Sequence, residues 1–175
     1  MRYASIAVAT VVLTTLSMMP AIAATSADTT VTFTVEATDG LNITAPASAA
    51  LSDTTPGGDA SGSLGVVTVT DERSAINASW TVTAELASSF TTGTQTPAET
   101  IYGSNVDYAP GPAINPVNGP FVPGGTGPLF APRTAFSRSL AAGNNSVSWN
   151  PTLTVHVPAA AVAGDYTGVV RHSVA

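Results

Sequence analysis

Residues Leu64–Phe90 read LGVVTVTDERSAINASWTVTAELASSF, and this stretch decides the fold. It holds two runs, Leu64–Asp71 and Ser79–Leu86, in which apolar residues alternate with hydroxylated or charged ones. Successive side chains of a strand point to opposite faces, so each run predicts a β-strand with one apolar face. Trp80 and Val82 share the apolar face of the second run. Because a tryptophan can bury about 150–250 Å², we expect both side chains in the core of a small sandwich.

Similar patterns predict short strands on both sides of this stretch. They cover Thr29–Ala37, Leu41–Thr44, Ala49–Ser52, Thr100–Tyr108, Arg133–Leu140, Ser146–Trp149, Leu153–Val157 and Tyr166–Val174. Asp39-Gly40 is a hairpin-turn signal, and Asp53–Gly62 is predicted as a loop from its Gly, Pro and Asp content. The sequence therefore predicts an all-β fold, an antiparallel β-sandwich with immunoglobulin-like or related Greek-key topology.

The N-terminus has the layout of a secretory signal peptide. Arg2 precedes the apolar run Ala4–Met19, and Ala21-Ile22-Ala23 supplies an A-x-A cleavage site. We expect cleavage after Ala23, with Ala24 as the alternative, so that residues 1–23 are the signal peptide and residues 24–175 form a single domain. The apolar run is too short and wrongly flanked for a good membrane span. We therefore expect a secreted, extracellular protein with no membrane insertion after signal cleavage.

The charge and cysteine content of the chain limit the classes of partner and site that it can have. Without Arg2 the five basic residues fall to four, against eleven acidic ones, and there is no lysine. No basic patch can form to hold phosphates, so we expect no nucleic acid as partner and no attraction to anionic lipid. Cysteine is absent, which leaves the exported domain free of disulfides and excludes thiol catalysis and cysteine metal sites.

The segment Ala109–Pro132 stands apart in composition, with seven prolines and five glycines among its 24 residues. Proline removes a ladder donor, so this segment is predicted as a long loop that cannot hold a central strand. Its apolar side chains either cap an open end of the sandwich or are exposed for a partner. The candidate interaction residues are Ile114, Val117, Phe121, Leu129 and Phe130.

Gly164-Asp165-Tyr166 precedes the last predicted strand. A tyrosine that enters a late strand just after a turn can hydrogen-bond back to that turn, as in the tyrosine corner of immunoglobulin-like sandwiches. The alternative is an ordinary half-buried strand tyrosine.

Three stretches resemble, in order and spacing, the WxL-domain family of secreted surface proteins. They read VTVTDERSAINASWTVTAELASSF, then ETIYGSNVDYAPG, then TLTVHVPAAAVAGDYTG. The first family motif stands here as Trp80-Thr81-Val82, with valine in place of leucine. The second Trp-x-Leu is missing, and Arg171-His172-Ser173 occupies its place. The resemblance implies a β-sandwich that associates non-covalently with the Gram-positive cell wall, and the missing second motif predicts weaker binding than in typical relatives.

Catalytic and metal-binding patterns are weak. Ser61-Gly62-Ser63-Leu64-Gly65 lacks the first glycine of a nucleophile elbow. His156 and His172 are the only histidines, and both are interpreted as solvated or hydrogen-bonded strand residues. Asp53 and Asp59 flank a glycine-rich loop without the D-x-D-x-D spacing of a calcium site. We therefore expect no enzyme activity, no cofactor and no metal.

Two functions follow as hypotheses. The first is a non-catalytic surface protein that binds cell-wall polymer or another surface protein. The alternative is a self-assembling structural or adhesive subunit that uses an unpaired edge strand. The sequence leaves the oligomeric state open between them.

Overall fold

The computed structural model describes residues 29–37 and 40–175. The predicted signal peptide and Asp39 of the predicted turn lie outside the described residues. The chain divides after Thr34, and the fold below is that of residues 35–175. Among the described residues, no helix is long and apolar enough to cross a membrane.

The described chain forms thirteen strands and two short 3-10 turns, at Pro97–Glu99 and Gly103–Asn105. The strands are β1 (Leu41–Thr44), β2 (Asp59–Ser63), β3 (Val67–Asp71), β4 (Ala78–Thr91), β5 (Thr100–Ile101), β6 (Val106–Ala109), β7 (Ala113–Val117), β8 (Phe121–Pro123), β9 (Gly127–Pro128), β10 (Arg133–Ala141), β11 (Asn145–Trp149), β12 (Thr152–His156) and β13 (Thr167–Val174). Every pairing between them is antiparallel. The prediction of an all-β antiparallel sandwich is confirmed.

One layer of the sandwich is made of two sheets that continue each other. Their orders are β1-β3-β11-β7 and β2-β12-β6-β9. The chain passes from β2 to β3, from β6 to β7 and from β11 to β12 after only two or three residues, so the two sheets share one bend. Gly65 lies at this bend with φ of +83°, and an added Cβ would stand 2.7 Å from Pro46 Cγ. The bend therefore requires glycine at this position.

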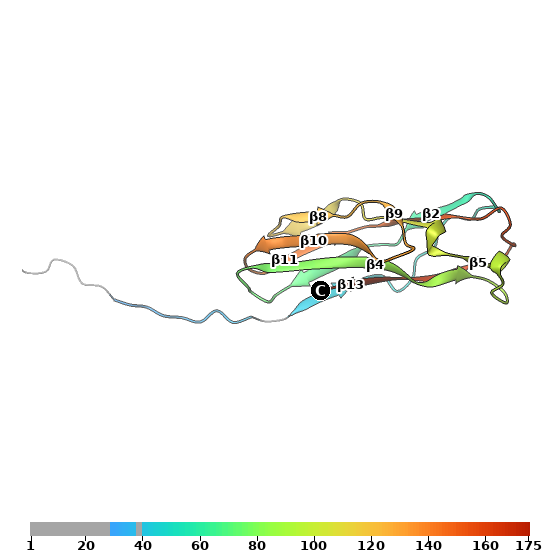
Figure 1. The fold of residues 1–175 in the computed structure, drawn as a ribbon. Helices are drawn as coiled ribbons and strands as arrows, with labels where there is room; N and C mark the ends of the chain where they lie inside the picture. The colour runs from blue at the N-terminus through green and yellow to red at the C-terminus, as the bar shows by residue number, and fades with distance from the viewer. Residues whose placement is uncertain (1–28, 38–39) are drawn as a thin grey trace, which may run out of the picture. The chain divides into compact units, whose positions relative to one another are not determined.

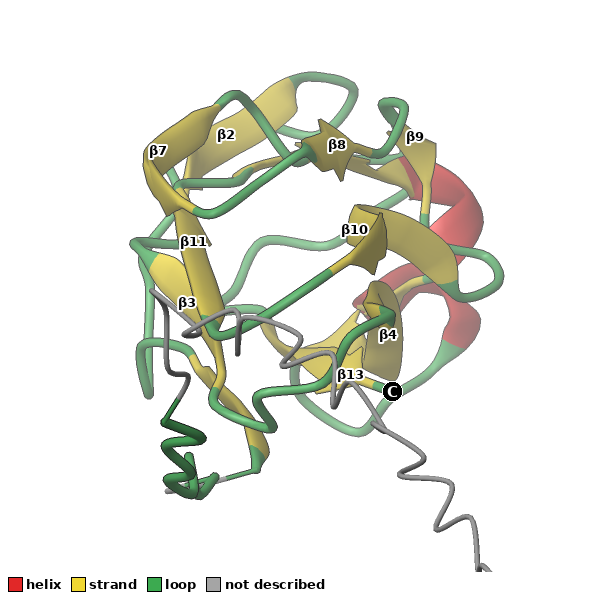
Figure 2. Cartoon of the chain, turned by 90° about the vertical axis from the view of Figure 1, so that its left-hand side faces the viewer, coloured by secondary structure: helices red, strands yellow, loops and turns green. Residues whose placement is uncertain are grey.

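The opposite layer has the order β13-β4-β10-β8, with β5 paired to the far end of β4. Figure 2 shows β7, β11 and β3 facing β10, β4 and β13 across the core, and Figure 1 shows β11, β10, β4 and β13 from the side. The pairs β2 with β12, β4 with β10 and β6 with β9 are nested inside one another along the chain. This nesting is the double Greek key of a jelly roll. Of the two predicted topologies, immunoglobulin-like or related Greek-key, the structure therefore has the second.

The core lies between the layers and is aromatic at its centre. Trp80, Val82 and Trp149 are buried, at 2%, 0% and 0% exposure. Phe136 stacks on Trp149 with ring centroids 4.8 Å apart, and Phe121 lies 5.7 Å from Trp80. Trp80 therefore packs in the core instead of offering its ring to a ligand.

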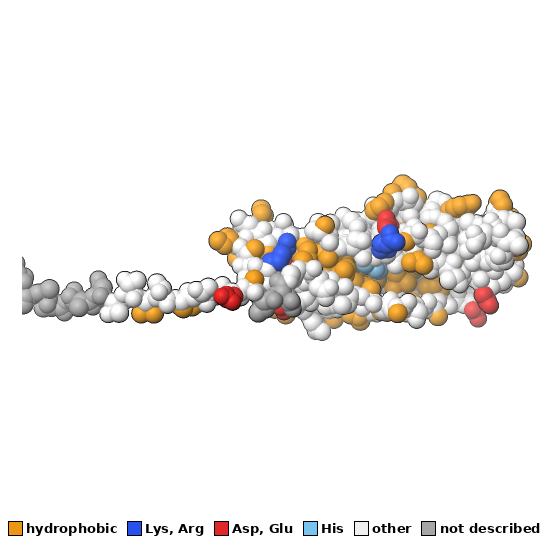
Figure 3. Space-filling model, turned by 90° about the horizontal axis from the view of Figure 1, so that it is seen from below, with side chains coloured by type: hydrophobic (Ala, Val, Ile, Leu, Met, Phe, Trp, Pro, Cys, Tyr) orange, Lys and Arg blue, Asp and Glu red, His pale blue; other side chains and the backbone are white. Residues whose placement is uncertain are grey.

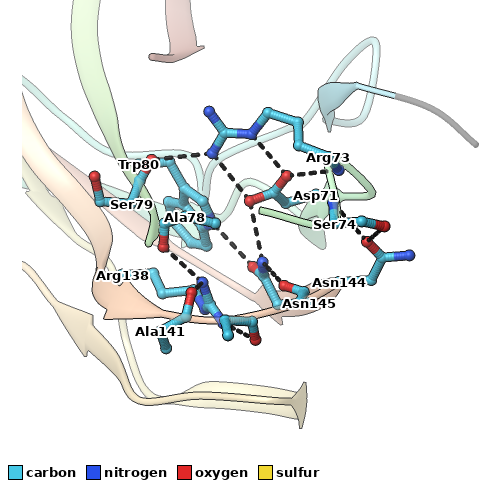
Figure 4. A network of polar contacts seen from close by, with 12 residues as sticks. Asp71, Arg73, Ser74, Ala78, Ser79, Trp80, Arg138, Ala141, Asn144 and Asn145 are labelled. Atoms are coloured by element: carbon cyan, nitrogen blue, oxygen red, sulfur yellow. Dashed lines mark hydrogen bonds and ion pairs between the residues drawn. The ribbon is translucent and has the colours of Figure 1, made fainter. Parts of the chain in front are cut away.

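A buried polar network joins the two layers at Trp80 (Figure 4). The guanidinium of Arg73 donates two hydrogen bonds to the carboxylate of Asp71, at 2.8 and 3.0 Å. Asn145 Nδ2 donates to Asp71 Oδ2 at 3.0 Å, and Trp80 Nε1 donates to Asn145 Oδ1 at 2.9 Å. The hydrogen bond from Arg73 lowers the pKa of Asp71 to about 2. The hydrogen bonds that run from Arg73 through Asp71 and Asn145 thus fix the indole of Trp80, and each of these polar groups has a partner.

Four predictions about strands and loops differ from the structure. Thr29–Ala37 and Ala49–Ser52 form no strand, although the Ser52 amide donates to the Ser61 carbonyl at 2.9 Å. The predicted loop Asp53–Gly62 includes most of β2. The predicted loop 109–132 carries β7, β8 and β9, and all three lie at sheet edges. Proline is tolerated on edge strands, where its missing N–H faces away from the ladder.

The tyrosine corner is confirmed at Tyr166. Its hydroxyl donates to the Val162 carbonyl at 2.9 Å and lies 3.2 Å from the Ala98 carbonyl. The hydroxyl thus ties Tyr166 to the turn before β13 and lies beside the segment before β5.

Candidate functional site

The sandwich is open along one seam, where β1 of one layer comes close to β13 of the other. Among the described residues β13 pairs with β4 alone, and no ladder joins it to β1. Two adjoining cavities lie beside this seam and share Ala49, Leu51 and Phe90. The cavity at β13 has a volume of about 180 Å³, and the one at 162–166, just before β13, has a volume of about 640 Å³. We call this continuous hollow the β13 groove.

Three groups of residues line the β13 groove. One wall is the chain at 45–56, which has no regular structure between β1 and β2. The other wall is 162–166 together with 168–170 and His172. Val67, Ile101, Leu153 and Val155, which belong to the buried core, lie at the floor. The groove therefore reaches from the surface to the hydrophobic core.

The lining carries little charge. Its ionisable side chains are His172, Asp53, Asp165 and Tyr166, against a majority of Ala, Val, Leu, Ile, Phe and Pro. Figure 3, which views the side on which β13 lies in Figure 1, shows a band of hydrophobic side chains along this face. An apolar band beside an open sheet edge is typical of a surface that binds another chain.

His172 connects the groove to the aromatic core. The Trp149 indole donates to Tyr108 Oη at 3.1 Å, and Tyr108 Oη lies 2.9 Å from His172 Nε2. Since the indole can only donate, the tyrosine hydroxyl accepts from it and donates to a neutral imidazole. Burial lowers the pKa of His172 to about 4 and raises the pKa of Tyr108 to about 12. The neutral forms of both groups are therefore the stable ones across the physiological range.

This arrangement predicts a loss of stability in weak acid. The unfolded chain binds a proton at His172 near pH 6.5, whereas the folded chain does so only near pH 4, so the free energy of unfolding falls as pH drops between these values. We expect a loss of up to about 3 kcal/mol from this group, with no change above pH 6.5. Urea unfolding of wild type and His172→Gln at pH 7, 5.5 and 4 measures it as the difference between the two proteins.

His156 contributes with the opposite sign, because its hydrogen bond with Asp59 raises its pKa, but it is present in both proteins and cancels in their difference. The stability that protonated His156 supplies is present below pH 6.5 and is lost as pH rises through its folded pKa. Equal pH profiles for wild type and His172→Gln would show that the imidazole is not held neutral by burial.

The candidate interaction residues do not form one site. Leu129 is buried and Phe121 packs against the core, while Ile114 is half-buried on β7. Val117 and Phe130 are 57% and 73% exposed. Part of the segment thus caps the core, and the exposed part lies outside the residues that line the groove. The sequence does not indicate the groove, because the pattern at 49–52 predicts a strand whereas the structure leaves 45–56 without regular structure. The Ala and Pro content of that segment is the signal that could have indicated it.

Among the described residues, His156 lies between two carboxylates, those of Asp59 and Asp107. His156 Nδ1 lies 2.8 Å from Asp59 Oδ1, and Nε2 lies 3.3 Å from Asp107 Oδ2, on an exposed surface. His156 is thus a hydrogen-bonded strand residue, as predicted. Within the described part of the chain, no group of three or more His, Cys, Asp or Glu could hold a metal ion.

No family model, no curated protein and no solved structure matches the chain. The resemblance to the WxL-domain family therefore stays a prediction that depends on the three stretches quoted above.

Proposed function

We propose that this protein is a non-catalytic, secreted surface protein whose domain binds another polypeptide through the β13 groove. The observation that carries the proposal is the position of the groove along the free edge of β13. A strand edge supplies backbone N–H and C=O groups to an extended peptide, and an adjoining apolar hollow accepts alternate side chains of that peptide. The groove therefore combines the two elements that strand addition needs.

The lining favours a polypeptide over wall polymer as the direct ligand. Both tryptophans are buried, so neither can stack on a sugar ring. The aromatic side chains in the groove are Phe90 and Tyr166, and the hydroxyl of Tyr166 is already bound to the protein backbone. Association with the cell wall, which the resemblance implies, would then occur through a surface protein that the groove binds.

The matched pair Val169→Glu and Val122→Glu tests this function. Val169 lines the groove on β13 and is 52% exposed, whereas Val122 is 56% exposed on β8 and lies outside the groove. A buried carboxylate would oppose binding in the groove, so we expect Val169→Glu to lower the cell-bound fraction of the exported protein about tenfold or more. The measurement is quantitative immunoblotting of cells and medium after expression of each full chain in its own host.

Val122→Glu should leave the bound fraction unchanged, because Val122 lies outside the groove. It is a matched control, since both substitutions place a charge on an exposed strand position. Because the contact is apolar, washing with 1 M salt, at which the Debye length is about 3 Å, should not release the wild-type protein. Equal bound fractions for the two variants, or complete release by salt, would refute binding through the groove.

A further inference from the structure

Residues 29–37 have the sequence of a strand but not the structure of one. Val31, Phe33 and Val35 alternate with Thr30, Thr32 and Thr34, which is the strongest period-2 pattern before β1. In the structure no strand forms over 29–37, and the three apolar side chains are 80%, 85% and 76% exposed. The described chain thus holds a strand-like segment with an unburied apolar face.

The β13 groove offers what this segment lacks. At about 3.3 Å per residue, the seven residues 31–37 span about 23 Å, and the eight residues of β13 span about 26 Å. The groove needs apolar side chains at alternate positions, and the segment provides three of them within that length. The described segment has one charged residue, Glu36, so its apolar face can enter the groove without burying a charge.

We infer that residues 29–37 of one copy add as a strand to the free edge of β13 in a second copy. The inference is conditional on the proposed function, since it names the polypeptide that the groove binds. Val31, Phe33 and Val35 would face the groove, and the threonines between them would face solvent. The added strand would pair with the free edge of β13 beside the irregular chain at 45–51, where no described strand supplies β13 with a second ladder.

Donor strand and acceptor groove are different surfaces of the same chain, so the contact is heterologous. Contacts of this kind continue from copy to copy and produce open chains of subunits unless a rotation closes them into a ring. Each copy would receive a strand from one neighbour and give its own strand to the next. We therefore infer a linear assembly of secreted subunits whose strength comes from apolar burial and a backbone ladder.

The pair Phe33→Asp and Thr32→Asp tests the donor. Both variants add one negative charge to the same segment, but Phe33 faces the groove and Thr32 faces solvent in the inferred contact. Burial of a phenylalanine is lost and a charge is buried in Phe33→Asp, so we expect the concentration needed for assembly to rise about 100-fold or more. For Thr32→Asp we expect a change of less than about fivefold. Sedimentation velocity of the secreted protein over a range of concentrations measures both.

Cross-linking between two separately labelled copies tests the acceptor. The chain contains no cysteine, so introduced cysteines are the only reactive thiols. Val170 and Leu51 lie on opposite walls of the groove. The Phe33→Cys variant is mixed with the Val170→Cys variant or with the Leu51→Cys variant, and the mixture is oxidised. We expect a disulfide between unlike copies, and much less of it when Thr32→Cys replaces Phe33→Cys.

The alternative outcomes are distinct. A cross-link only within one chain, in the double variant that carries both cysteines, would show that the segment closes its own groove and would overturn the inference. If Val169→Glu loses cell binding while Phe33→Asp keeps both assembly and cell binding, the groove binds a different polypeptide, and the proposed function stands without the inference. If neither substitution has an effect, both fail.

Discussion

Replacing Trp80 by alanine is expected to lower the free energy of unfolding by about 3–5 kcal/mol, because the side chain is packed in the core. The side chain is 2% exposed, contacts Phe121 and donates from Nε1 to Asn145. The substitution leaves a cavity in the core and removes the donor that Asn145 Oδ1 accepts from. Thermal and urea unfolding of the variant should show a large share of the total stability lost, because domains are stabilised by only about 5–15 kcal/mol.

Trp80→Phe separates the two contributions. It keeps the aromatic contact with Phe121 and loses the hydrogen bond to Asn145, so we expect an intermediate loss. Val122→Ala, at a position 56% exposed on β8, is the surface control and should change stability by less than about 0.5 kcal/mol. An unfolding curve of Trp80→Ala that overlays the wild-type curve would contradict the burial of the indole.

The second large effect is expected at Arg138. Its guanidinium is 1% exposed and donates to four backbone carbonyls, those of Ala78, Asn118, Ala141 and Ala142, at 2.6 to 3.4 Å. It thus ties β4 to the end of β10 and to the turn before β8. Arg138→Met keeps the length of the side chain but removes every donor, and we expect a loss of about 2–5 kcal/mol.

Arg138→Lys tests whether the planar guanidinium itself is required. A lysine keeps the charge, but its single ammonium cannot reach carbonyls spread around a planar fork. We expect Lys to restore less than half of the loss caused by Met. Full stability in Arg138→Lys would mean that charge alone suffices, which the four-carbonyl geometry contradicts.

The sequence predicts the centre of this fold because the strands there are two-sided. In β3 and β4 one face is apolar and the other hydroxylated, so alternation alone identifies Val67, Val69, Trp80 and Val82 as core residues. The tyrosine corner at Tyr166 is predictable for a similar reason, since a turn followed by a strand tyrosine is a local pattern.

The edges of the sandwich are less predictable, because propensity does not fix what an edge pairs with. Three edge strands lie inside the proline-rich segment 109–132, where ladder hydrogen bonds on one side are enough to form a strand. The opposite error occurs at Thr29–Ala37, where a strong alternating pattern finds no partner within the described chain. A strand needs a neighbour, so its sequence predicts the face it will bury but not the chain that supplies the ladder.

The groove could not be predicted from sequence because it depends on a missing pairing between β1 and β13. These two strands are separated in the chain by the 122 residues 45–166. Its walls combine the irregular chain at 45–56 with a strand near the C-terminus. The polar network around Asp71 is equally absent from local patterns, since Asn145 completes it from β11, 74 positions further along the chain. In both cases the topology brings the residues together, and local patterns do not report topology.

Hydrogen exchange of the backbone amides is the most direct test of strand addition to β13. The account predicts that amides in 29–37 and on the free edge of 167–174 exchange fast when the wild-type protein is dilute, and become protected together when it is concentrated enough to assemble. Phe33→Asp should abolish the protection of both segments, and Thr32→Asp should retain it. Assembly without protection of β13, or protection of β13 that persists in Phe33→Asp, would contradict the account.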